Sequence, residues 1–285
     1  MKSYLYYPGC SLKGTAKEYD ISVTALMTSL GADLLEIDDW TCCGATAAQA
    51  VDSGIGLALG ARNLALAEKN SRPDPEKEPL DILVPCSACY LNLKTAQFDL
   101  EKDKAKREGI NQVLSKENLS VQTHLKVRHL LDVLSLDVDW KKGLPFSNPL
   151  EGIKVAPYYG CQCLRPFTVF DNPESPHSMD EMIQAAGAQV LDWDMGAQCC
   201  GASNATTKPD VGQYLVGKIL DNAKDAHCIV TVCPMCQMNL ETYQDKAHPV
   251  PVLYLPQFLG LAMGIARDRL GLELNLSENV QLTGG

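Results

Sequence analysis

The chain has 285 residues, of which 46% are hydrophobic and 21% charged, the composition of a globular protein with a sizeable core. Its formal net charge of −10 argues against a nucleic-acid surface, which would need a basic stripe. No apolar run is long enough to span a bilayer and no signal peptide is recognisable, so we expect a cytoplasmic protein without a transmembrane segment. Twelve cysteines are unusual in that compartment, where clustered cysteines more often bind metal or perform redox chemistry.

The first half of the chain predicts an alternation of strands and helices. Short apolar and aromatic stretches are typical of buried strands, and amphipathic runs are typical of helices. In chain order we predict a strand at 3–7, a helix at 15–30, a strand at 33–37, a helix at 53–69, a strand at 80–86 and a helix that starts beside Cys86. A capping box at Thr15 and Glu18 begins the first helix, and Gly31 ends it. The charged stretch 101–109 predicts a solvated helix end and a loop.

The second half repeats this order of elements. We predict a strand at 153–159, a helix at 178–186, a strand at 189–193, a helix at 209–223, a strand at 227–233 and a helix that starts beside Cys233. Ser178 and Glu181 form a second capping box, and Gly187 ends that helix. Pro209 occupies the first position of the next helix.

Strands that alternate with helices indicate βαβ units and a mostly parallel sheet. The whole unit occurs twice, about 150 residues apart, which indicates a duplicated domain. We therefore predict an α/β fold made of two tandem, duplicated Rossmann-like domains, at residues 1–145 and 146–285, with a linker at 141–152.

Each half supplies one cysteine after the first strand, then a Cys-Cys-Gly, then a C-x-x-C. The first set is Cys10, Cys42, Cys43, Cys86 and Cys89, and the second set is Cys161, Cys199, Cys200, Cys233 and Cys236. Every member lies at the carboxyl end of a predicted strand or just after it, which is the edge where open α/β sheets place their sites. We therefore expect each set to converge at the rim of its sheet.

Five thiols per set point to a particular kind of metal centre. Thiolates favour soft metals, either zinc or the iron of iron–sulfur clusters. Structural zinc and ordinary cubane clusters both take four ligands, and neither explains the fifth cysteine. A vicinal pair suggests a cluster whose irons are not equivalent, with one sulfur bridging two of them. Thiol–disulfide exchange at a C-x-x-C alone would leave the Cys-Cys-Gly words unexplained.

The pattern of Cys, CCG and CxxC resembles the CCG cysteine-rich domain, and two copies in one chain resemble the B subunit of heterodisulfide reductase. The resemblance covers nearly the whole chain, although the spacing from Gly44 to Cys86 is longer than usual and that from Gly201 to Cys233 is slightly short. It implies two non-cubane [4Fe–4S] clusters at the sheet rims, one on each five-cysteine set. It further implies a shared cavity in which a disulfide is split, one sulfur going to each cluster.

Two functions follow from this resemblance. The leading hypothesis is the catalytic subunit of a heterodisulfide reductase-like complex, which cleaves or forms a small-molecule or carrier-bound disulfide at paired clusters. The alternative is an iron–sulfur electron-transfer or anchoring subunit of a succinate-, glycolate- or lactate-type dehydrogenase complex. In the leading case the implied partners are a C-type, ferredoxin-like iron–sulfur subunit and an A-type flavoprotein subunit.

Other polar or reactive residues have simpler interpretations. Cys228 lies inside a predicted strand and is expected in the core, and the repeat favours Cys161 over Cys163 as the ligand. The tyrosines at positions 6, 7, 158 and 159 either line the cavity or pack the strands. The five histidines show no ligand spacing and are expected to be surface or satisfied residues: His124, His129, His177, His227 and His248. No glycine-rich phosphate loop is present, so a flavin or nucleotide would belong to another subunit.

Overall fold

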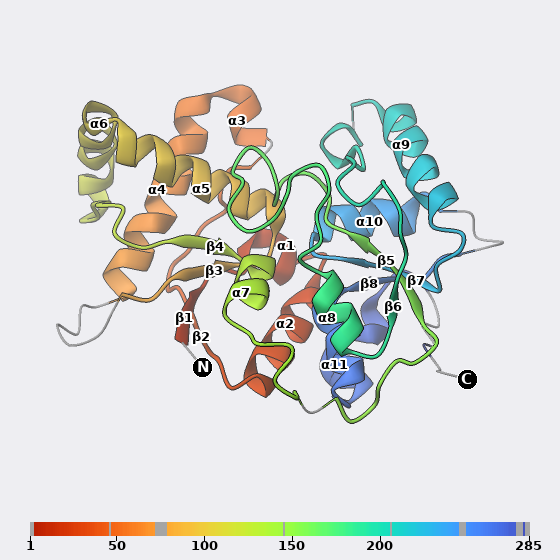
Figure 1. Ribbon diagram of the computed structural model, residues 1–285. Helices are drawn as coiled ribbons and strands as arrows, with labels where there is room; N and C mark the ends of the chain where they lie inside the picture. The colour runs from red at the N-terminus through yellow and green to blue at the C-terminus, as the bar shows by residue number, and fades with distance from the viewer. Residues whose placement is uncertain are drawn as a thin grey trace.

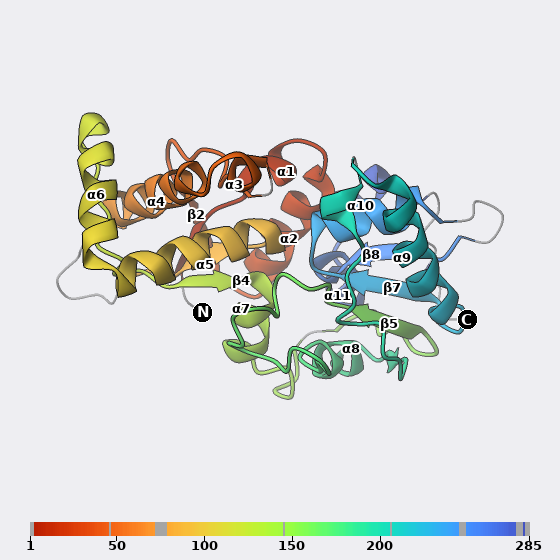
Figure 2. The same ribbon diagram turned by 90° about the horizontal axis from the view of Figure 1, so that it is seen from above.

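The structure, a computed structural model, contains two four-stranded parallel sheets that lie side by side (Figures 1 and 2). It describes residues 3–45, 47–71, 79–144, 146–205, 207–244, 249–277 and 282. The strand order is β2-β1-β3-β4 in the first sheet and β6-β5-β7-β8 in the second, so the two halves share one topology. The predicted α/β fold with a duplicated unit is confirmed.

The first half carries the first sheet and seven described α-helices. Its strands are β1 (Ser3–Tyr6), β2 (Asp33–Glu36), β3 (Ile82–Val84) and β4 (Val127–His129). Its helices are α1 (Gly9–Lys13), α2 (Lys17–Ser29), α3 (Ala47–Val51), α4 (Ser53–Asn70), α5 (Ser87–Lys102), α6 (Lys104–Leu114) and α7 (Leu130–Leu136), with a 3₁₀ turn at Ser115–Glu117.

The second half carries the second sheet and four described α-helices. Its strands are β5 (Lys154–Tyr158), β6 (Gln189–Val190), β7 (Cys228–Thr231) and β8 (Val252–Tyr254). Its helices are α8 (Asp180–Ala185), α9 (Pro209–Asn222), α10 (Pro234–Thr242) and α11 (Leu255–Ala262), with 3₁₀ turns at Ala202–Asn204, Arg267–Leu270 and Leu272–Leu274. The predicted domain boundary at residues 145 and 146 falls between α7 and β5 and stays a prediction.

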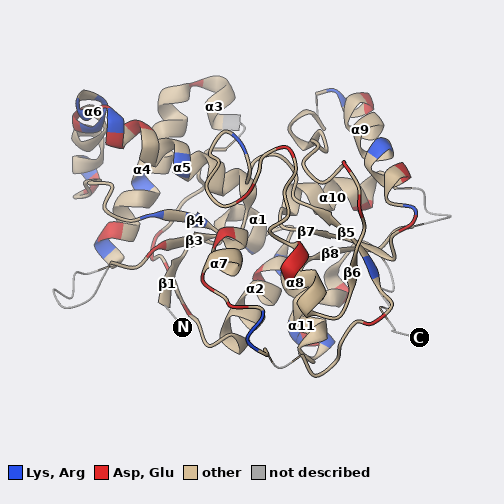
Figure 3. Ribbon diagram, in the orientation of Figure 1, with Lys and Arg blue, Asp and Glu red and all other residues tan. Residues whose placement is uncertain are grey.

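The inner strands of each sheet are buried on both faces, which is why they read as continuous apolar runs. Every described residue of β3 and β7 is buried. The edge strands β2 and β6 are partly exposed, and β6 is only two residues long where five were predicted. Charged residues lie mostly on the outer helices and loops (Figure 3).

The fourth strand of each half was not predicted. β4 and β8 are three residues long, too short to show a period, and each passes directly into a helix. The prediction of a loop over 101–109 was also wrong, because a new helix, α6, begins there. Asp103 caps this helix, because its carboxylate accepts a hydrogen bond from the Lys106 N–H at 2.9 Å. The chain therefore begins a second helix directly after α5 and does not pass into a loop.

Neither predicted capping box forms. Helix α2 begins at Lys17 after Ala16, and α8 begins at Asp180 after Met179, in both cases without a side-chain cap. Glu18 instead faces the second half, where the Tyr254 hydroxyl lies 3.5 Å from its carboxylate. The predicted helix ends are confirmed, since Gly31 and Gly187 follow α2 and α8 with φ angles of 74° and 86°.

The two halves are joined by a buried contact between α2 and the second half, where α2 packs on α11 (Figure 1). The Tyr19 and Tyr254 rings stack with centroids 4.0 Å apart and planes at 6°. The Tyr19 hydroxyl lies 3.2 Å from the Pro85 carbonyl and 3.0 Å from the Val232 carbonyl. These carbonyls belong to the residues that immediately precede Cys86 and Cys233. The Tyr19 side chain therefore contacts the backbone next to both C-x-x-C segments.

Candidate iron–sulfur sites

The carboxyl ends of the strands deliver all ten cysteines to the rims of the two sheets. In the first half, Cys10 lies in α1 directly after β1, the Cys-Cys pair follows β2, and the C-x-x-C spans the junction of β3 and α5. The second half repeats the placement after β5, β6 and β7. Residues as far apart as Cys10 and Cys89 are thereby brought together, as the topology of an open parallel sheet requires.

The first set forms two close thiol pairs. The Cys10 and Cys42 sulfurs are 4.0 Å apart at the surface, and the Cys43 and Cys89 sulfurs are 3.3 Å apart below them. Cys10 and Cys42 are exposed, whereas Cys43, Cys86 and Cys89 are buried. The set therefore has an outer and an inner layer.

The second set has the same two layers. All five of its cysteines line one cavity, together with Ser87 of the first half. The Cys200 and Cys236 sulfurs are 3.6 Å apart in the buried layer, which also contains Cys233. Cys199 is exposed and Cys161 half-buried.

Two glycines allow the closest approach of the backbone to the buried sulfurs. Gly9 and Gly160 immediately precede the first cysteine of each set, with φ angles of 72° and 70°. A Cβ atom on Gly9 would lie 2.8 Å from the Cys89 sulfur, and one on Gly160 would lie 2.9 Å from the Cys236 sulfur. Both positions therefore require glycine for conformation and for space.

The Cys-Cys-Gly turn points backbone N–H groups at sulfur. Gly44 and Gly201 adopt φ angles of 81° and 76°, and their N–H groups donate to Cys42 at 3.5 Å and Cys199 at 3.3 Å. The Ala45 N–H donates to Cys43 at 3.4 Å. Hydrogen bonds of this kind favour the thiolate, which is the metal-binding form of cysteine.

Within each set, thiols hydrogen-bond to neighbouring thiolates. Hydrogen bonds from Cys42 and then Cys89 lower the pKa of Cys43 to about 4. In the second set, a hydrogen bond from Cys161 lowers the pKa of Cys199 to about 6, and one from Cys236 lowers that of Cys233 to about 7. In each set, hydrogen bonds between sulfurs therefore favour the thiolate form of one cysteine over that of its partner.

Matching tyrosines and asparagines hold the Cys-Cys turns in place. The Tyr7 hydroxyl donates to the Thr41 carbonyl at 2.6 Å, and the Tyr158 hydroxyl donates to the Gln198 carbonyl at 2.7 Å. These carbonyls precede Cys42 and Cys199. Tyr7 and Tyr158 are buried and hold the Cys-Cys turns, whereas Tyr159 lines the cavity of the second set, so the two interpretations left open by the sequence apply to different tyrosines.

The asparagine pair acts on the second cysteine of each turn. The Asn92 side-chain amide donates to the Cys43 carbonyl, and that of Asn239 donates to the Cys200 carbonyl, the latter at 3.0 Å. Both asparagines are buried, and each lies three residues after the last cysteine of its C-x-x-C. Their recurrence in the sequence was the signal that could have identified them as site residues.

The donor sets fit iron–sulfur clusters. Each provides five thiols in two layers with backbone N–H donors nearby, which is the ligand chemistry of such clusters. Across the described ranges, no three His, Cys, Asp or Glu side chains gather closely enough to hold a single metal ion. The assignment of particular thiols as ligands stays a proposal.

The remaining cysteines and histidines lie elsewhere. Cys228 is fully buried in β7, as predicted, and Cys163 is buried with its thiol donating to the Tyr159 carbonyl at 3.3 Å. The exposed histidines are His124, His177 and His227, and His129 is buried with hydrogen bonds to both ring nitrogens. His248 lies outside the described residues.

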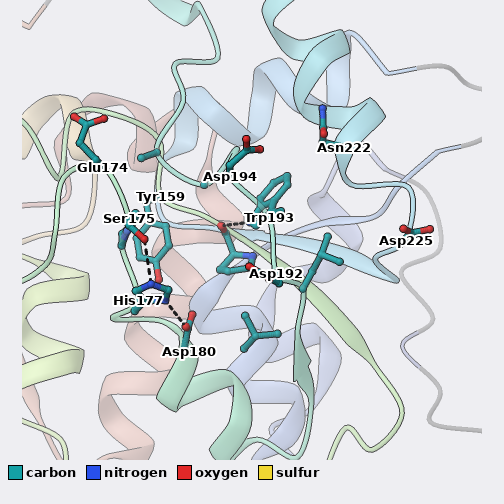
Figure 4. A pocket seen from close by; sticks show the side chains of 16 residues that line it. Tyr159, Glu174, Ser175, His177, Asp180, Asp192, Trp193, Asp194, Asn222 and Asp225 are labelled. Atoms are coloured by element: carbon teal, nitrogen blue, oxygen red, sulfur yellow. Dashed lines mark hydrogen bonds and ion pairs between the residues drawn. The ribbon is translucent and has the colours of Figure 1, made fainter.

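A larger hollow of about 830 Å³ lies beside the second set (Figure 4). Its acidic lining consists of Glu174, Asp180, Asp192, Asp194 and Asp225. His177 lies 2.8 Å from Asp180, and the Trp193 indole donates to the Pro157 carbonyl at 3.1 Å. Among the described residues, no cysteine lines this hollow, but Tyr159 lies on its wall and on the wall of the second thiol cavity, so the two cavities are neighbours.

Both halves of the chain match the Cysteine-rich domain (CCG) family, over residues 4–94 and 155–241. The chain is 38% identical to the 8-methylmenaquinol:fumarate reductase membrane anchor subunit of Wolinella succinogenes, over 99% of each chain. It is 27% identical to the B subunit of the ferredoxin:CoB-CoM heterodisulfide reductase of Methanosarcina mazei, over 99% of this chain and 96% of the relative.

A further comparison concerns the fold. A hypothetical protein from Helicobacter pylori resembles this chain with a TM-score of 0.75 at 15% identity, over 95% of this chain and 51% of that one. In the described part of the chain, no helix is both long and apolar enough to cross a membrane. The duplicated sheets, the ten rim cysteines and the two matched segments lead to one conclusion: the chain belongs to the CCG cysteine-rich domain family, with two copies of the domain in tandem.

Proposed function

We propose that this chain is an iron–sulfur subunit of a multi-subunit reductase, and that it carries electrons through two clusters, one on each five-cysteine set. The observation that supports this most directly is that both sets are complete and are built alike. Both have buried inner thiols, outer thiols at the surface and the same supporting tyrosine and asparagine. Such symmetry is expected if both sets are used.

The proposed ligands are the ten rim cysteines: Cys10, Cys42, Cys43, Cys86, Cys89, Cys161, Cys199, Cys200, Cys233 and Cys236. Cys161 is preferred to Cys163 because it lines the cavity with the other four members of its set. A bound iron–sulfur cluster supplies a one-electron carrier at each rim. The protein contributes a buried inner layer that excludes water and N–H donors that stabilise thiolate charge.

Between the two roles weighed from the sequence, electron transfer is the first candidate. It is supported by the relative of 38% identity, named as the anchor subunit of a quinol:fumarate reductase, which this chain matches over its full length. We propose a quinone-linked or related dehydrogenase complex, in which a flavoprotein and a ferredoxin-like iron–sulfur subunit exchange electrons with this chain.

Disulfide reduction is the second candidate, and the surface cysteines favour it. Cys10, Cys42 and Cys199 are exposed, so a sulfur substrate could reach both rims from solvent. Two one-electron sites can together supply the two electrons that cleavage of one disulfide consumes. The relatives named as the B subunit of heterodisulfide reductases, at 27% identity, support this role.

One set of measurements tests the proposal and separates its two candidates. Iron, acid-labile sulfide and zinc are measured on protein purified without oxygen, followed by EPR of the oxidised sample with and without a thiol. About eight irons and eight sulfides per chain are expected. An EPR signal that changes with thiol favours disulfide chemistry, and an unchanged signal favours electron transfer. Stoichiometric zinc without sulfide would overturn the proposal.

A further inference from the structure

Lys13 joins the helix that carries Cys10 to the end of strand β2. It is the last residue of α1 and lies three residues after Cys10. Its ammonium group lies 3.0 Å from the Asp20 carboxylate of α2 and 2.9 Å from the Glu36 carboxylate of β2. Glu36 is the last residue of β2, so one side chain connects α1 with the strand that leads to the Cys-Cys pair.

The Glu36 carboxylate also holds the segment before Cys42. The Trp40 indole N–H donates to Glu36 at 3.0 Å, and Trp40 lies two residues before Cys42. The Trp40 ring packs edge-on against Tyr7, with centroids 5.5 Å apart and planes at 71°. Lys13, Glu36 and Trp40 therefore form a continuous link between the segment that follows the first cysteine of the set and the segment that precedes the second.

This link bridges the two segments that carry the outer sulfurs. Cys10 and Cys42 are both exposed, and their sulfurs lie 4.0 Å apart at the surface. Single ion pairs at a surface contribute little, but networks of charges contribute more. This network extends into the core, because the buried Tyr6 hydroxyl donates to Asp20 at 2.6 Å. The link can therefore hold the two exposed cysteines in one relative position.

The second half does not repeat the link. Leu164 lies three residues after Cys161, at the position that matches Lys13, and its apolar side chain is buried. Asp192 matches Glu36, counted from the glycine that ends the preceding helix. Asp192 lines the large acidic hollow, and among the described residues no Lys or Arg lines that hollow. The link therefore distinguishes the first site from the second.

We propose that Lys13 is a positioning residue of the first site, which fixes the spacing of Cys10 and Cys42 through Glu36 and Trp40 and so slows the release of iron from the cluster held there. This rests on the proposed function, because it presupposes a cluster on the first set. Removing a residue that orients metal ligands typically costs about 10–100-fold in metal affinity. Lys13 acts on the cysteines through the backbone of α1 and β2, so we expect the lower end of this range.

The test measures how fast a ferrous-iron chelator removes iron from Lys13→Met, on the complete chain purified without oxygen. Methionine keeps an unbranched side chain but carries no charge. Two backgrounds separate the clusters, since Cys200→Ser leaves only the first and Cys43→Ser leaves only the second. We expect iron release from the first cluster to become about tenfold faster and release from the second to stay unchanged. Lys13→Arg, which keeps the cation, should restore the slow release.

Trp40→Phe tests whether the effect passes through Glu36, because phenylalanine keeps a ring beside Tyr7 but lacks the indole N–H. If Lys13 and Trp40 are the two ends of one link, breaking either end breaks the whole. The double variant should then release iron no faster than the faster of the two single variants. Accelerations that multiply in the double variant would show independent effects and overturn the link.

Lys106→Met is the matched control, because Lys106 is a lysine of the same half with a similar side-chain exposure, 41% against 39% for Lys13, and pairs with Asp99 at 3.3 Å. It should change neither rate. Unchanged release from the first cluster in Lys13→Met overturns the inference, and so does equal acceleration of both clusters, which would indicate general loosening. If Lys13→Met does not fold, Glu36→Gln replaces it, with acceleration confined to the first cluster expected and no acceleration overturning the inference.

Failure of the proposed function is distinguishable from failure of this inference. Metal analysis of the unmodified chain precedes the kinetics. Absence of iron and sulfide from the first set rejects both. Two clusters that release iron at rates independent of Lys13 reject only the role of the lysine.

Discussion

The contact of Gly160 with the Cys236 sulfur makes Gly160→Ala a sharp test of how the second site is built. The φ angle of 70° costs an alanine roughly 1–2 kcal/mol in the left-handed region. The new Cβ would lie 2.9 Å from the sulfur, at least about 0.6 Å inside the 3.5–4.0 Å optimum for nonbonded heavy atoms. Relieving such overpacking costs roughly 1–3 kcal/mol more.

We expect Gly160→Ala to lower the free energy of unfolding by roughly 2–5 kcal/mol and to displace Cys236. Iron should fall to about half of its normal content, because only the first set remains intact. The assay combines urea unfolding followed by circular dichroism with iron and sulfide analysis. Gly9→Ala should produce the mirror result, with the second cluster retained and the first lost.

Gly217→Ala is the matched control. Gly217 lies within α9, and an added Cβ there meets no atom within 4 Å. The same substitution should therefore stabilise the chain by about 0.5–1 kcal/mol, since alanine favours helix over glycine. A Gly160→Ala variant with unchanged stability and both clusters intact would refute the packing argument.

The site and its supports make four further predictions. Cys43→Ser and Cys200→Ser should each remove one cluster, measured as about four irons lost per chain, and loss of both from either variant would contradict independent sites. Asn239→Ala should cost about 1–3 kcal/mol in urea unfolding, because it leaves the buried Cys200 carbonyl unpaired; a cost below that of the exposed control Asn222→Ala would sink this reading. Tyr19→Phe should cost a similar amount, because the single O–H that lies between the Pro85 and Val232 carbonyls is lost, and an unaltered urea midpoint would show that the hydroxyl does not join the halves. Burial lowers the pKa of His129 to about 3 in the folded chain, against about 6.5 in the unfolded chain. Its contribution to the free energy of unfolding is therefore complete above about pH 6.5 and is lost as the pH falls toward 3. His129→Gln should make the free energy of unfolding less dependent on pH in this range, by up to about 1.4 kcal/mol per pH unit, and identical pH profiles for the two proteins would contradict this prediction.

The sequence predicted the fold well where its signals were long and repeated. Strand runs such as 80–86 and the terminating glycines Gly31 and Gly187 were correctly interpreted because period and cap chemistry are local. The duplication then placed each cysteine at a strand end. Strand β3 is equally short but lies within the apolar run 80–86, whereas β4 escaped because its sequence, Val-Arg-His, forms no apolar run.

The capping boxes were wrong for a different reason. Thr15 and Glu18 match the motif, but Glu18 reaches toward Tyr254 across the contact between the halves. A local pattern was overridden by a partner more than 230 residues away. The sequence also carries no sign that Ser87, within the first C-x-x-C, lines the cavity of the second set.

The contact at Tyr19 has an evolutionary consequence. The two halves are copies of one unit, yet the single Tyr19 hydroxyl lies within hydrogen-bond distance of a carbonyl in each of them, and Ser87 of the first half lines the cavity of the second set. Expressed without residues 146–285, residues 1–145 would lose the Val232 carbonyl that both hydroxyls contact. Selection is therefore expected to act on the two halves together. A substitution at the contact between the halves in one half is expected to be accompanied by a compensating substitution in the other half.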